Sequence, residues 1–152
     1  MSVISPDGNG VCYTYDAIGN MTTVDQAKLT TSQGYTQVTN GTDVDYTYDS
    51  VTQRLTSITT ESTTYSFTYD AFGNTTGITA NTSSLASYTY NSFNGKLNTL
   101  TYGNGLVVKY SYDTLDRVSQ ICYNTGVNGA FVVVYSYEYD AAGRLYEVTD
   151  DR

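Results

Sequence analysis

The sequence predicts an all-β protein in which consecutive antiparallel β-hairpins form a twisted or spiralling strip. A Tyr-x-Tyr motif recurs along the chain, with the period-two spacing that places both rings on one face of a strand. Each copy ends on Asp or Asn, where a turn signal begins. Thr, Ser, Asn, Tyr and Gly dominate the composition and give helices little support. These three observations together favour hairpins over a helical fold.

The motif occurs six times in the same order, which is typical of a repeat array. The aromatic pairs are Tyr13 and Tyr15, Tyr46 and Tyr48, Phe67 and Tyr69, Tyr88 and Tyr90, Tyr110 and Tyr112, and Tyr137 and Tyr139. The anchor residues that follow these pairs are Asp16, Asp49, Asp70, Asn91, Asp113 and Asp140, at intervals of 33, 21, 21, 22 and 27 residues. We therefore expect a single array over residues 1–152, with a basic unit of about 21 residues and two insertions.

Tyrosine has to provide much of the buried surface in this chain. The apolar fraction is 39%, but it includes 17 Tyr, so few aliphatic side chains remain for an ordinary core. One repeat buries too little surface to offset the conformational entropy that its own residues lose. Ladder hydrogen bonds and contact with the next repeat must supply the rest, as in solenoid proteins. We expect the aromatic rings to be shared between successive hairpins.

The turns have a recognisable signature. Residues 16–19, 70–73 and 140–143 place Asp first and Gly fourth. This pattern suits a type I turn closed by Gly19, Gly73 or Gly143 at positive φ, which is the usual three-residue hairpin with a bulge. In the fifth unit Asp116 stands where Gly would be, and segments 49–54 and 91–96 are one residue longer and need a different loop. Asn-Gly pairs at residues 9–10, 40–41, 94–95, 104–105 and 128–129 suit two-residue hairpin turns.

The strand that returns from the turn carries two apolar residues three positions apart. The pairs are Met21 and Val24, Leu55 and Ile58, Leu97 and Leu100, Val118 and Ile121, and Leu145 and Val148. This spacing fits neither a strand nor a helix, so either a bulge lies between the two members or both faces are covered. The insertion between residues 25 and 42 predicts a long loop or an extra hairpin. Arg54, Arg117 and Arg144 follow their turns and can reach an Asp of the same or a neighbouring repeat.

Several classes of site are excluded or disfavoured. The chain has no His, so Ser-His-Asp and Cys-His centres are impossible, and its net charge of −8 argues against nucleic acid. No stretch resembles a membrane span or a signal peptide. The recurrent Asp residues could pair as catalytic carboxylates, but each stands where a type I turn favours a capping acceptor. We predict no catalytic residue, no cofactor and no metal, because the nearest calcium candidates, residues 7–10 and 43–45, lack the spacing of a dedicated loop.

The two cysteines, Cys12 and Cys122, are isolated and lack the spacing of a zinc or redox site. We interpret them as two partly buried thiols. A bridge between them would require the array to curl back on itself or to pair between chains.

Residues 137–145, Tyr-Glu-Tyr-Asp-Ala-Ala-Gly-Arg-Leu, form a motif that resembles the YD repeat of RHS-repeat proteins. Residues 100–106, Leu-Thr-Tyr-Gly-Asn-Gly-Leu, also look like a segment common in that family. The resemblance spans about residues 11 to 149. It has departures, since Asn91 replaces the acid, Asn20 and Asn74 replace Arg, and Thr75 replaces the apolar residue.

The resemblance implies a strip of hairpins that spirals into a hollow shell, of which this chain would be a segment. In bacterial polymorphic toxins and insecticidal toxin complexes such a shell encloses a toxic domain. Related strips in wall-associated bacterial proteins and in teneurins mediate contact at cell surfaces. The resemblance thus implies a secreted or cell-surface bacterial protein, and we see no separate toxin or protease domain within the chain. The recurrent Tyr, Asp, Gly and Arg positions would be structural.

Three functional hypotheses follow. The first is a non-enzymatic structural strip, part of a shell around a toxin cargo or of a surface wall. The second is a self-assembling extracellular filament subunit whose copies pair through open strand edges. The third is an adhesin that binds carbohydrate through exposed Tyr, although Tyr rows in register are more often a packing face. The expected partners are neighbouring repeats or further copies of the chain, with a toxin cargo or a cell-surface glycan as additional candidates.

Overall fold

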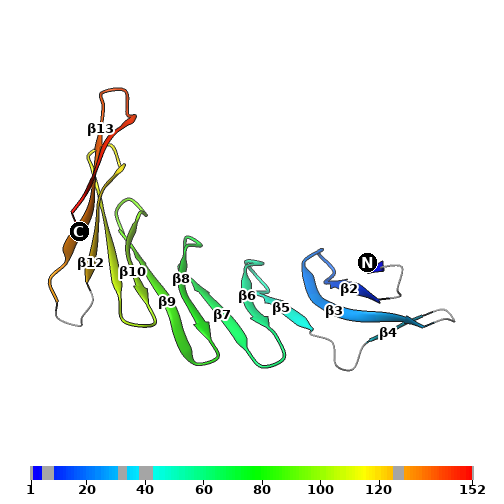
Figure 1. Ribbon diagram of the computed structural model, residues 1–152. Coiled ribbons are helices and arrows are strands. Elements are labelled where there is room, and N and C mark those ends of the chain that lie inside the picture. Colours follow the sequence, from blue (N-terminus) through cyan, green and yellow to red (C-terminus); the bar gives the residue numbers. More distant parts are fainter. Residues whose placement is uncertain (1, 5–8, 31–33, 38–42, 125–128, 152) are drawn as a thin grey trace. The chain divides into compact units, whose positions relative to one another are not determined.

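The computed structural model describes residues 2–4, 9–30, 34–37, 43–124 and 129–151 of the 152-residue chain. Every regular element in this part is a β-strand, and the strands pair antiparallel with strands close to them in sequence (Figure 1). The predicted all-β hairpin architecture is therefore confirmed. The chain divides into two compact units, Met1–Thr68 with Thr79–Thr82, and Tyr69–Ile78 with Ser83–Arg152. That the chain forms one array throughout stays a prediction.

The first unit is a series of antiparallel strand pairs. It contains β1 (Ser2–Ile4), β2 (Asn9–Tyr15), β3 (Met21–Thr30), β4 (Gly34–Gln37), β5 (Val44–Tyr48), β6 (Leu55–Thr59) and most of β7 (Thr64–Tyr69). The long strand β3 pairs with β2, with β5 near its start and with β4 near its end. The insertion predicted as a long loop or an extra hairpin thus contains the hairpin β3–β4, while residues 31–33 and 38–42 lie outside the described part.

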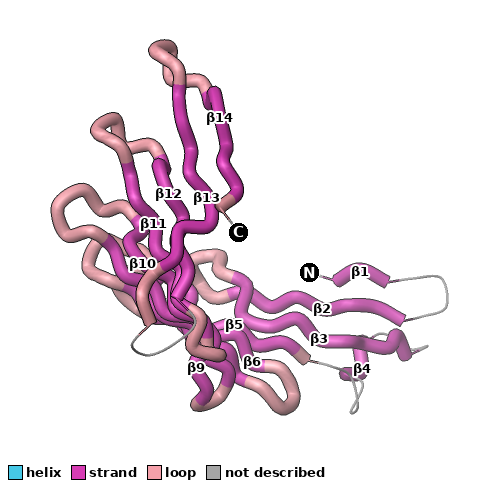
Figure 2. The backbone as a smooth tube through the Cα atoms, turned by 60° about the vertical axis from the view of Figure 1, so that its left-hand side comes forward, coloured by secondary structure: helices cyan, strands magenta, loops and turns pink. Residues whose placement is uncertain are grey.

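The second unit continues the same pattern. It contains most of β8 (Thr75–Ala80), then β9 (Ser83–Tyr90), β10 (Leu97–Tyr102), β11 (Val107–Tyr112), β12 (Val118–Asn124), β13 (Val132–Tyr139) and β14 (Leu145–Asp150). Strands β9 to β14 pair antiparallel, each with the next. Figure 2 shows the hairpins β11–β12 and β13–β14, each as two neighbouring strands joined by a loop at one end.

A β-bulge explains the period-three spacing of the apolar pairs. In the hairpin β2–β3, Tyr15 lies opposite Met21 but Thr14 lies opposite Thr23, so the return strand contains one extra residue. The same shift occurs in the hairpins β5–β6, β9–β10, β11–β12 and β13–β14. Of the two alternatives left open by the sequence, the bulge is correct. It places both apolar residues opposite the Tyr pair of their own hairpin.

The turns follow the predicted chemistry at the Asp-initiated positions. In the short turns the N–H of the fourth residue donates to the carbonyl of the first, as Gly19 does to Asp16 at 3.2 Å, and Asp116 adopts φ 64° in place of Gly. The two longer turns use a different loop, in which the donor is the fifth residue. Gln53 donates to Asp49 at 2.9 Å and Gly95 donates to Asn91 at 2.8 Å.

The Asn-Gly pairs predict two-residue turns with positive φ. The predicted loop length is wrong wherever it can be compared with the structure, although Gly95 and Gly105 do adopt positive φ, at 70° and 87°. Asn9 and Gly10 lie in strand β2, and residues 94–95 belong to the longer loop just described. Residues 102–106 form a three-residue turn, since Gly105 donates to the carbonyl of Tyr102 at 2.9 Å. The strand ladder and the neighbouring capping bonds therefore override the local preference of Asn-Gly. Residues 40–41 and Asn128 lie outside the described part.

The core is thin. Among the described side chains only four apolar ones are buried, namely Ala86, Val108, Cys122 and Val134, all in the second unit, and none is fully buried. The side chains between the two Tyr residues form a polar second face, on which Thr47 bonds Thr56 at 2.9 Å and Thr89 bonds Thr99 at 2.6 Å. With so few buried side chains among the described residues, the sheet depends on contacts between adjacent hairpins.

Candidate functional site

A tyrosine hydroxyl joins successive hairpins. The second Tyr of the motif donates to the carbonyl of the first residue in the return strand of the preceding hairpin. These bonds run from Tyr48 to Met21 at 2.9 Å, and from Tyr90 to Thr75, Tyr112 to Leu97 and Tyr139 to Val118 at 2.8 Å each. Met21, Leu97 and Val118 each lie directly beside a bulge, where the strand ladder is disrupted. The motif thus specifies a link between repeats as well as a strand.

Two of the linking tyrosines, Tyr90 and Tyr112, have raised pKa values. Burial raises the pKa of Tyr90, and the charge of Asp70 adds to the effect. Burial also raises the pKa of Tyr112 and Tyr110, with further contributions from neighbouring tyrosines. A phenol with a raised pKa remains a hydrogen-bond donor at neutral pH, which is the role that it has here. Tyr15, in the first YD hairpin, is 49% exposed.

The first Tyr of each pair has a different place. It lies opposite the second apolar residue of the return strand in its own hairpin. The pairs are Tyr13 with Val24, Tyr46 with Ile58, Tyr88 with Leu100, Tyr110 with Ile121, and Tyr137 with Val148. All five rings are half-buried. This Tyr therefore contributes mainly apolar contact, whereas the second Tyr contributes a hydrogen bond.

Each turn carboxylate accepts hydrogen bonds within its own turn. In the short turns one oxygen of Asp113 accepts the N–H groups of Leu115 and Arg117, both at 2.9 Å, and the other accepts Nε of Arg117 at 2.7 Å. Asp140 has the same contacts with Ala142 and Arg144. These groups cap turns, and the structure does not bring them together as catalytic pairs.

Asn20 and Asn74 explain two departures from the repeat motif. Nδ2 of Asn20 donates to Oδ2 of Asp16 at 3.0 Å, and Nδ2 of Asn74 donates to Oδ2 of Asp70 at 2.9 Å. Each amide occupies the position that Nε of Arg117 takes beside Asp113. The sequence places an amide or a basic residue four positions after these Asp residues, and the structure shows that both kinds of side chain bond to the carboxylate.

Hydrogen bonding lowers the pKa of the turn carboxylates. The backbone N–H of Arg117 is the main cause at Asp113, and the backbone N–H of Arg144 is the main cause at Asp140. At Asp49 the main cause is the backbone N–H of Thr52, with a smaller effect from the charge of Arg54. Burial opposes the shift and is the largest single influence at Asp16, but the hydrogen bonds outweigh it. These carboxyl groups are ionised at neutral pH and unsuited to act as general acids.

The basic residue of the turn reaches the next repeat. The guanidinium of Arg117 lies over the ring of Tyr139, 4.3 Å from its centroid, while it is paired with Asp113. In the preceding turn Lys96 lies 5.3 Å from the centroid of Tyr112 and donates to the carbonyl of Asp116 at 2.7 Å. Cation–π contact thus covers the same Tyr that makes the hydroxyl bond. Lys96 is therefore a further residue that links two repeats.

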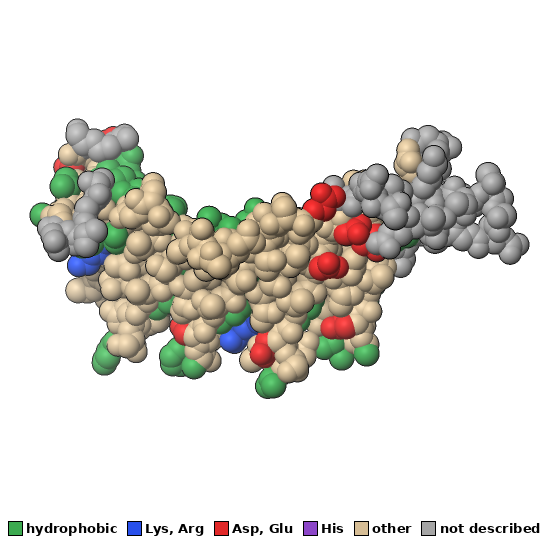
Figure 3. All heavy atoms as spheres, turned by 90° about the horizontal axis from the view of Figure 1, so that it is seen from below, with side chains coloured by type: hydrophobic (Ala, Val, Ile, Leu, Met, Phe, Trp, Pro, Cys, Tyr) green, Lys and Arg blue, Asp and Glu red, His purple; other side chains and the backbone are tan. Residues whose placement is uncertain are grey.

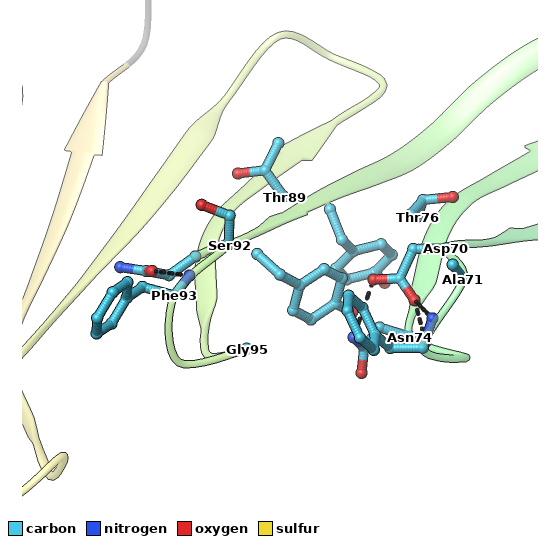
Figure 4. A pocket seen from close by; sticks show the side chains of 12 residues that line it. Asp70, Ala71, Asn74, Thr76, Thr89, Ser92, Phe93 and Gly95 are labelled. Atoms are coloured by element: carbon cyan, nitrogen blue, oxygen red, sulfur yellow. Dashed lines mark hydrogen bonds between the residues drawn. The ribbon is translucent and has the colours of Figure 1, made fainter.

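A groove lies between the tips of adjacent hairpins. In the second unit it has a volume of about 660 Å³ and is lined by Asp70, Phe72, Tyr88, Tyr90 and Phe93, among others. Figure 4 shows Phe93 and Gly95 on one hairpin across the groove from Asp70 and Asn74 on the other. Equivalent grooves lie between the turns 91–94 and 113–116 and, in the first unit, between Ile18 and Gln53.

The described residues contain no group of three or more Asp, Glu or Cys side chains arranged to hold a metal ion. Of the calcium candidates, Asp43 and Asp45 lie near Asp25, where burial and their two charges raise the pKa of that carboxyl. Asp7 and Gly8 lie outside the described part. Cys12 is half-buried and Cys122 buried, and both are free thiols. The described residues include no helix long and apolar enough to cross a membrane.

Comparison with known proteins agrees with this geometry. Several solved structures share the fold, and in three of them the region matched by this chain is 8% of the structure's own chain. The crystal structure of TcdB2-TccC3-Cdc42 has a TM-score of 0.73 at 17% identity over 95% of this chain. The crystal structure of TcdB2-TccC3 has a TM-score of 0.71 at 18% identity over 91%. The Tc holotoxin pore of Photorhabdus luminescens has a TM-score of 0.73 at 18% identity over 95%.

This chain therefore spans about one twelfth of the length of those chains, and at such identities the likeness establishes the fold. No match to a curated protein was found. A family model described as the teneurin YD-shell matches residues 14–131, which is most of the sequence. The resemblance to YD-repeat proteins is thus confirmed, and the chain belongs to the teneurin YD-shell family.

Proposed function

We propose that the chain is a non-enzymatic wall segment of an RHS/YD-repeat shell. The observation that carries the proposal is the hydroxyl bond from one hairpin to the one before it, as from Tyr112 to Leu97 and from Tyr139 to Val118. A link that recurs in four of the six YD hairpins allows a wall to be extended by adding hairpins. The carboxylates and guanidinium groups of the motif are used in the same construction, which leaves no described cluster for a reaction.

The complete protein would be secreted or exposed at a bacterial cell surface and would enclose a toxin cargo. This part of the proposal is supported by fold likeness to Tc toxin assemblies, whose chains are much longer than this one. The test is protease protection of the natural protein that contains this array. An enclosed cargo stays intact until the shell is denatured, whereas a cargo that is cleaved at once in the folded protein contradicts enclosure.

A filament subunit that pairs through open strand edges is the second candidate. The exposure of β14 favours this candidate, since Leu145 is 55% and Val148 is 48% exposed. The equivalent residues of β12, Val118 and Ile121, are by contrast half-buried. An apolar edge strand invites pairing with another strand. Negative-stain microscopy over a range of concentrations separates the two candidates, since filaments favour assembly and discrete particles favour a wall segment.

A glycan-binding adhesin has less support. The hydroxyls of Tyr48, Tyr90, Tyr112 and Tyr139 are already bonded to backbone carbonyls. Sugar recognition by these residues would therefore rest on the partly covered rings alone. Glycan-array binding that disappears on Tyr→Ala substitution without loss of folding would restore this hypothesis.

A further inference from the structure

An exposed apolar side chain stands at the tip of the YD turns. The tip residue is the second residue after the turn Asp or Asn. In the second unit these are Phe72, Phe93 and Leu115, which are 87%, 99% and 69% exposed, followed by the smaller Ala142. In the first unit they are Ile18 and Val51, which are 65% and 86% exposed. Figure 3 shows hydrophobic side chains, in green, that project separately along the lower edge of the molecule.

The turn fixes the tip residue in this position. The N–H of Phe72 donates to Oδ1 of Asp70 at 2.9 Å, and the N–H of Phe93 donates to Oδ1 of Asn91 at 2.8 Å. Leu115 has the same bond to Asp113. Because the backbone is held by the turn carboxylate or amide, the apolar side chain is presented outward without further ordering of the loop. Such preorganisation lowers the entropy cost of binding.

Two of the described turns at the opposite ends of the hairpins have polar tips. The turn between β6 and β7 contains Glu61 and Ser62, and the turn between β10 and β11 contains Asn104. An apolar turn tip is unusual because turns favour polar residues. Exposed apolar side chains also occur near the opposite ends, at Leu85, Tyr102 and Phe131. Among the described turns, however, the YD turns are the ones that carry an apolar side chain at a repeated position.

We propose that the hairpin tips of the second unit bind the same tips of a second copy of this chain. The ridge formed by Phe72, Phe93 and Leu115 alternates with two grooves, one of about 660 Å³ beside Phe93 and one of about 320 Å³ beside Asp113. The ridge side chains and the grooves both recur once per hairpin, at a spacing of roughly 10 Å for two strands. A partner with the same repeat can engage several tips at once, and a second copy has that repeat.

Charge and area agree with this occupant. Around the tips of the second unit, Asp70, Asp113, Asp116 and Asp140 are nearly balanced by Lys96, Arg117 and Arg144, although the whole chain carries a charge of −8. Two copies can therefore approach at this edge without strong repulsion. A Phe side chain buries roughly 150–250 Å², so four Phe rings from two copies bury about 600–1,000 Å². This area is below that of a standard stable interface and predicts a weak, concentration-dependent dimer.

Sedimentation velocity of the chain from about 10 µM to about 1 mM tests the proposal. We expect a reversible dimer whose dissociation constant rises by more than about tenfold in the double variant Phe72→Ser, Phe93→Ser. Both side chains are exposed, so circular dichroism and thermal unfolding should show an unchanged fold. The variant Leu145→Ser, Val148→Ser on β14 is the matched control and should dimerise like the parent chain. A parent chain that is monomeric throughout, or a tip variant that dimerises equally well, overturns the proposal.

Cross-linking locates the contact and separates it from strand-edge pairing. In a background of Cys12→Ser and Cys122→Ala, Ser92→Cys at the tip should form an intermolecular disulfide on mild oxidation. Thr149→Cys on β14 should not. The reverse result assigns association to the strand edge, which supports the filament hypothesis and rejects the tip interface. The shell function is tested separately by protease protection and does not depend on either outcome.

Discussion

The hydroxyl of Tyr112 lies 2.8 Å from the carbonyl oxygen of Leu97, and this bond joins the hairpin β11–β12 to the hairpin β9–β10. The distance is that of a normal O–H···O hydrogen bond. The ring of Tyr112 is also covered by Lys96, from the turn between β9 and β10, at 5.3 Å. Tyr112 therefore makes both a hydrogen bond and a cation–π contact with the preceding repeat.

Replacing Tyr112 by Phe should destabilise the protein by about 1 kcal/mol, because the hydroxyl bond is lost and the Leu97 carbonyl loses this donor. The matched control is Tyr110→Phe in the same strand, whose ring is also half-buried and whose hydroxyl makes no hydrogen bond with the described residues. Urea unfolding of both variants measures the difference. Equal stability of the two variants would show that the hydroxyl link contributes nothing.

At the turn carboxylate, Asp113→Asn should destabilise the protein less than Asp113→Ala does. Asparagine keeps an oxygen that can accept the N–H groups of Leu115 and Arg117, as Asn91 does for Phe93. It loses the charge that pairs with Arg117. Alanine loses both functions. We expect the melting temperature to fall in the order parent, Asn, Ala, and an Asn variant less stable than the Ala variant would contradict the capping role.

The turn carboxylates also predict how stability depends on pH. Asp16, Asp49, Asp70, Asp113 and Asp140 have lowered pKa values in the folded chain relative to the ordinary value of 3.8. A lowered pKa means that the unfolded state binds protons first as the pH falls. Their stabilising effect is therefore fully present above the ordinary pKa and is lost as the pH falls through the folded values. Thermal unfolding between neutral pH and about pH 2 should show a fall that begins near pH 4.

Asp25 predicts the opposite dependence. Burial and the charges of Asp43 and Asp45 raise its pKa in the folded chain, so its ionised form is destabilising above the ordinary value. Asp25→Asn should therefore raise the melting temperature at neutral pH. The gain should shrink as the pH falls and the parent carboxyl becomes protonated. A gain that is the same at acidic and neutral pH would exclude charge as its cause.

Much of the fold could be predicted because its signals are local. The spacing of Tyr110 and Tyr112 indicates a strand, and Asp140 followed by Gly143 indicates a turn with positive φ, which Gly143 adopts at 81°. These preferences act within a few residues and survive in the folded chain. The longer loops at Asp49 and Asn91 were predicted for the same reason, because one extra residue changes the turn that can close.

The links between repeats could not be predicted in the same way. The acceptor for Tyr48 is the carbonyl of Met21, which lies 27 residues earlier. Every residue has a backbone carbonyl, so the amino-acid sequence does not indicate which carbonyl accepts the hydrogen bond. The bulge beside Met21 was one of two alternatives because an apolar spacing of three does not fix strand register. Exposed tips such as Phe93 were missed because hydrophobicity alone suggests burial, whereas the turn forces this ring outward.

Gly103 should tolerate no side chain, because a Cβ at this position would lie 2.1 Å from the carbonyl oxygen of Ser84. Its N–H donates to the carbonyl of Leu85 at 2.8 Å, so the backbone is held against the start of β9 and cannot move away without losing that bond. Gly103→Ala should therefore cost about 3 kcal/mol or more. The matched control is Gly105→Ala in the same turn, which meets no atom within 4 Å and should cost only about 1–2 kcal/mol for its positive φ. Chemical denaturation of both variants measures the difference. A Gly103 variant no less stable than the Gly105 variant would show that Gly103 does not lie this close to the backbone of Ser84.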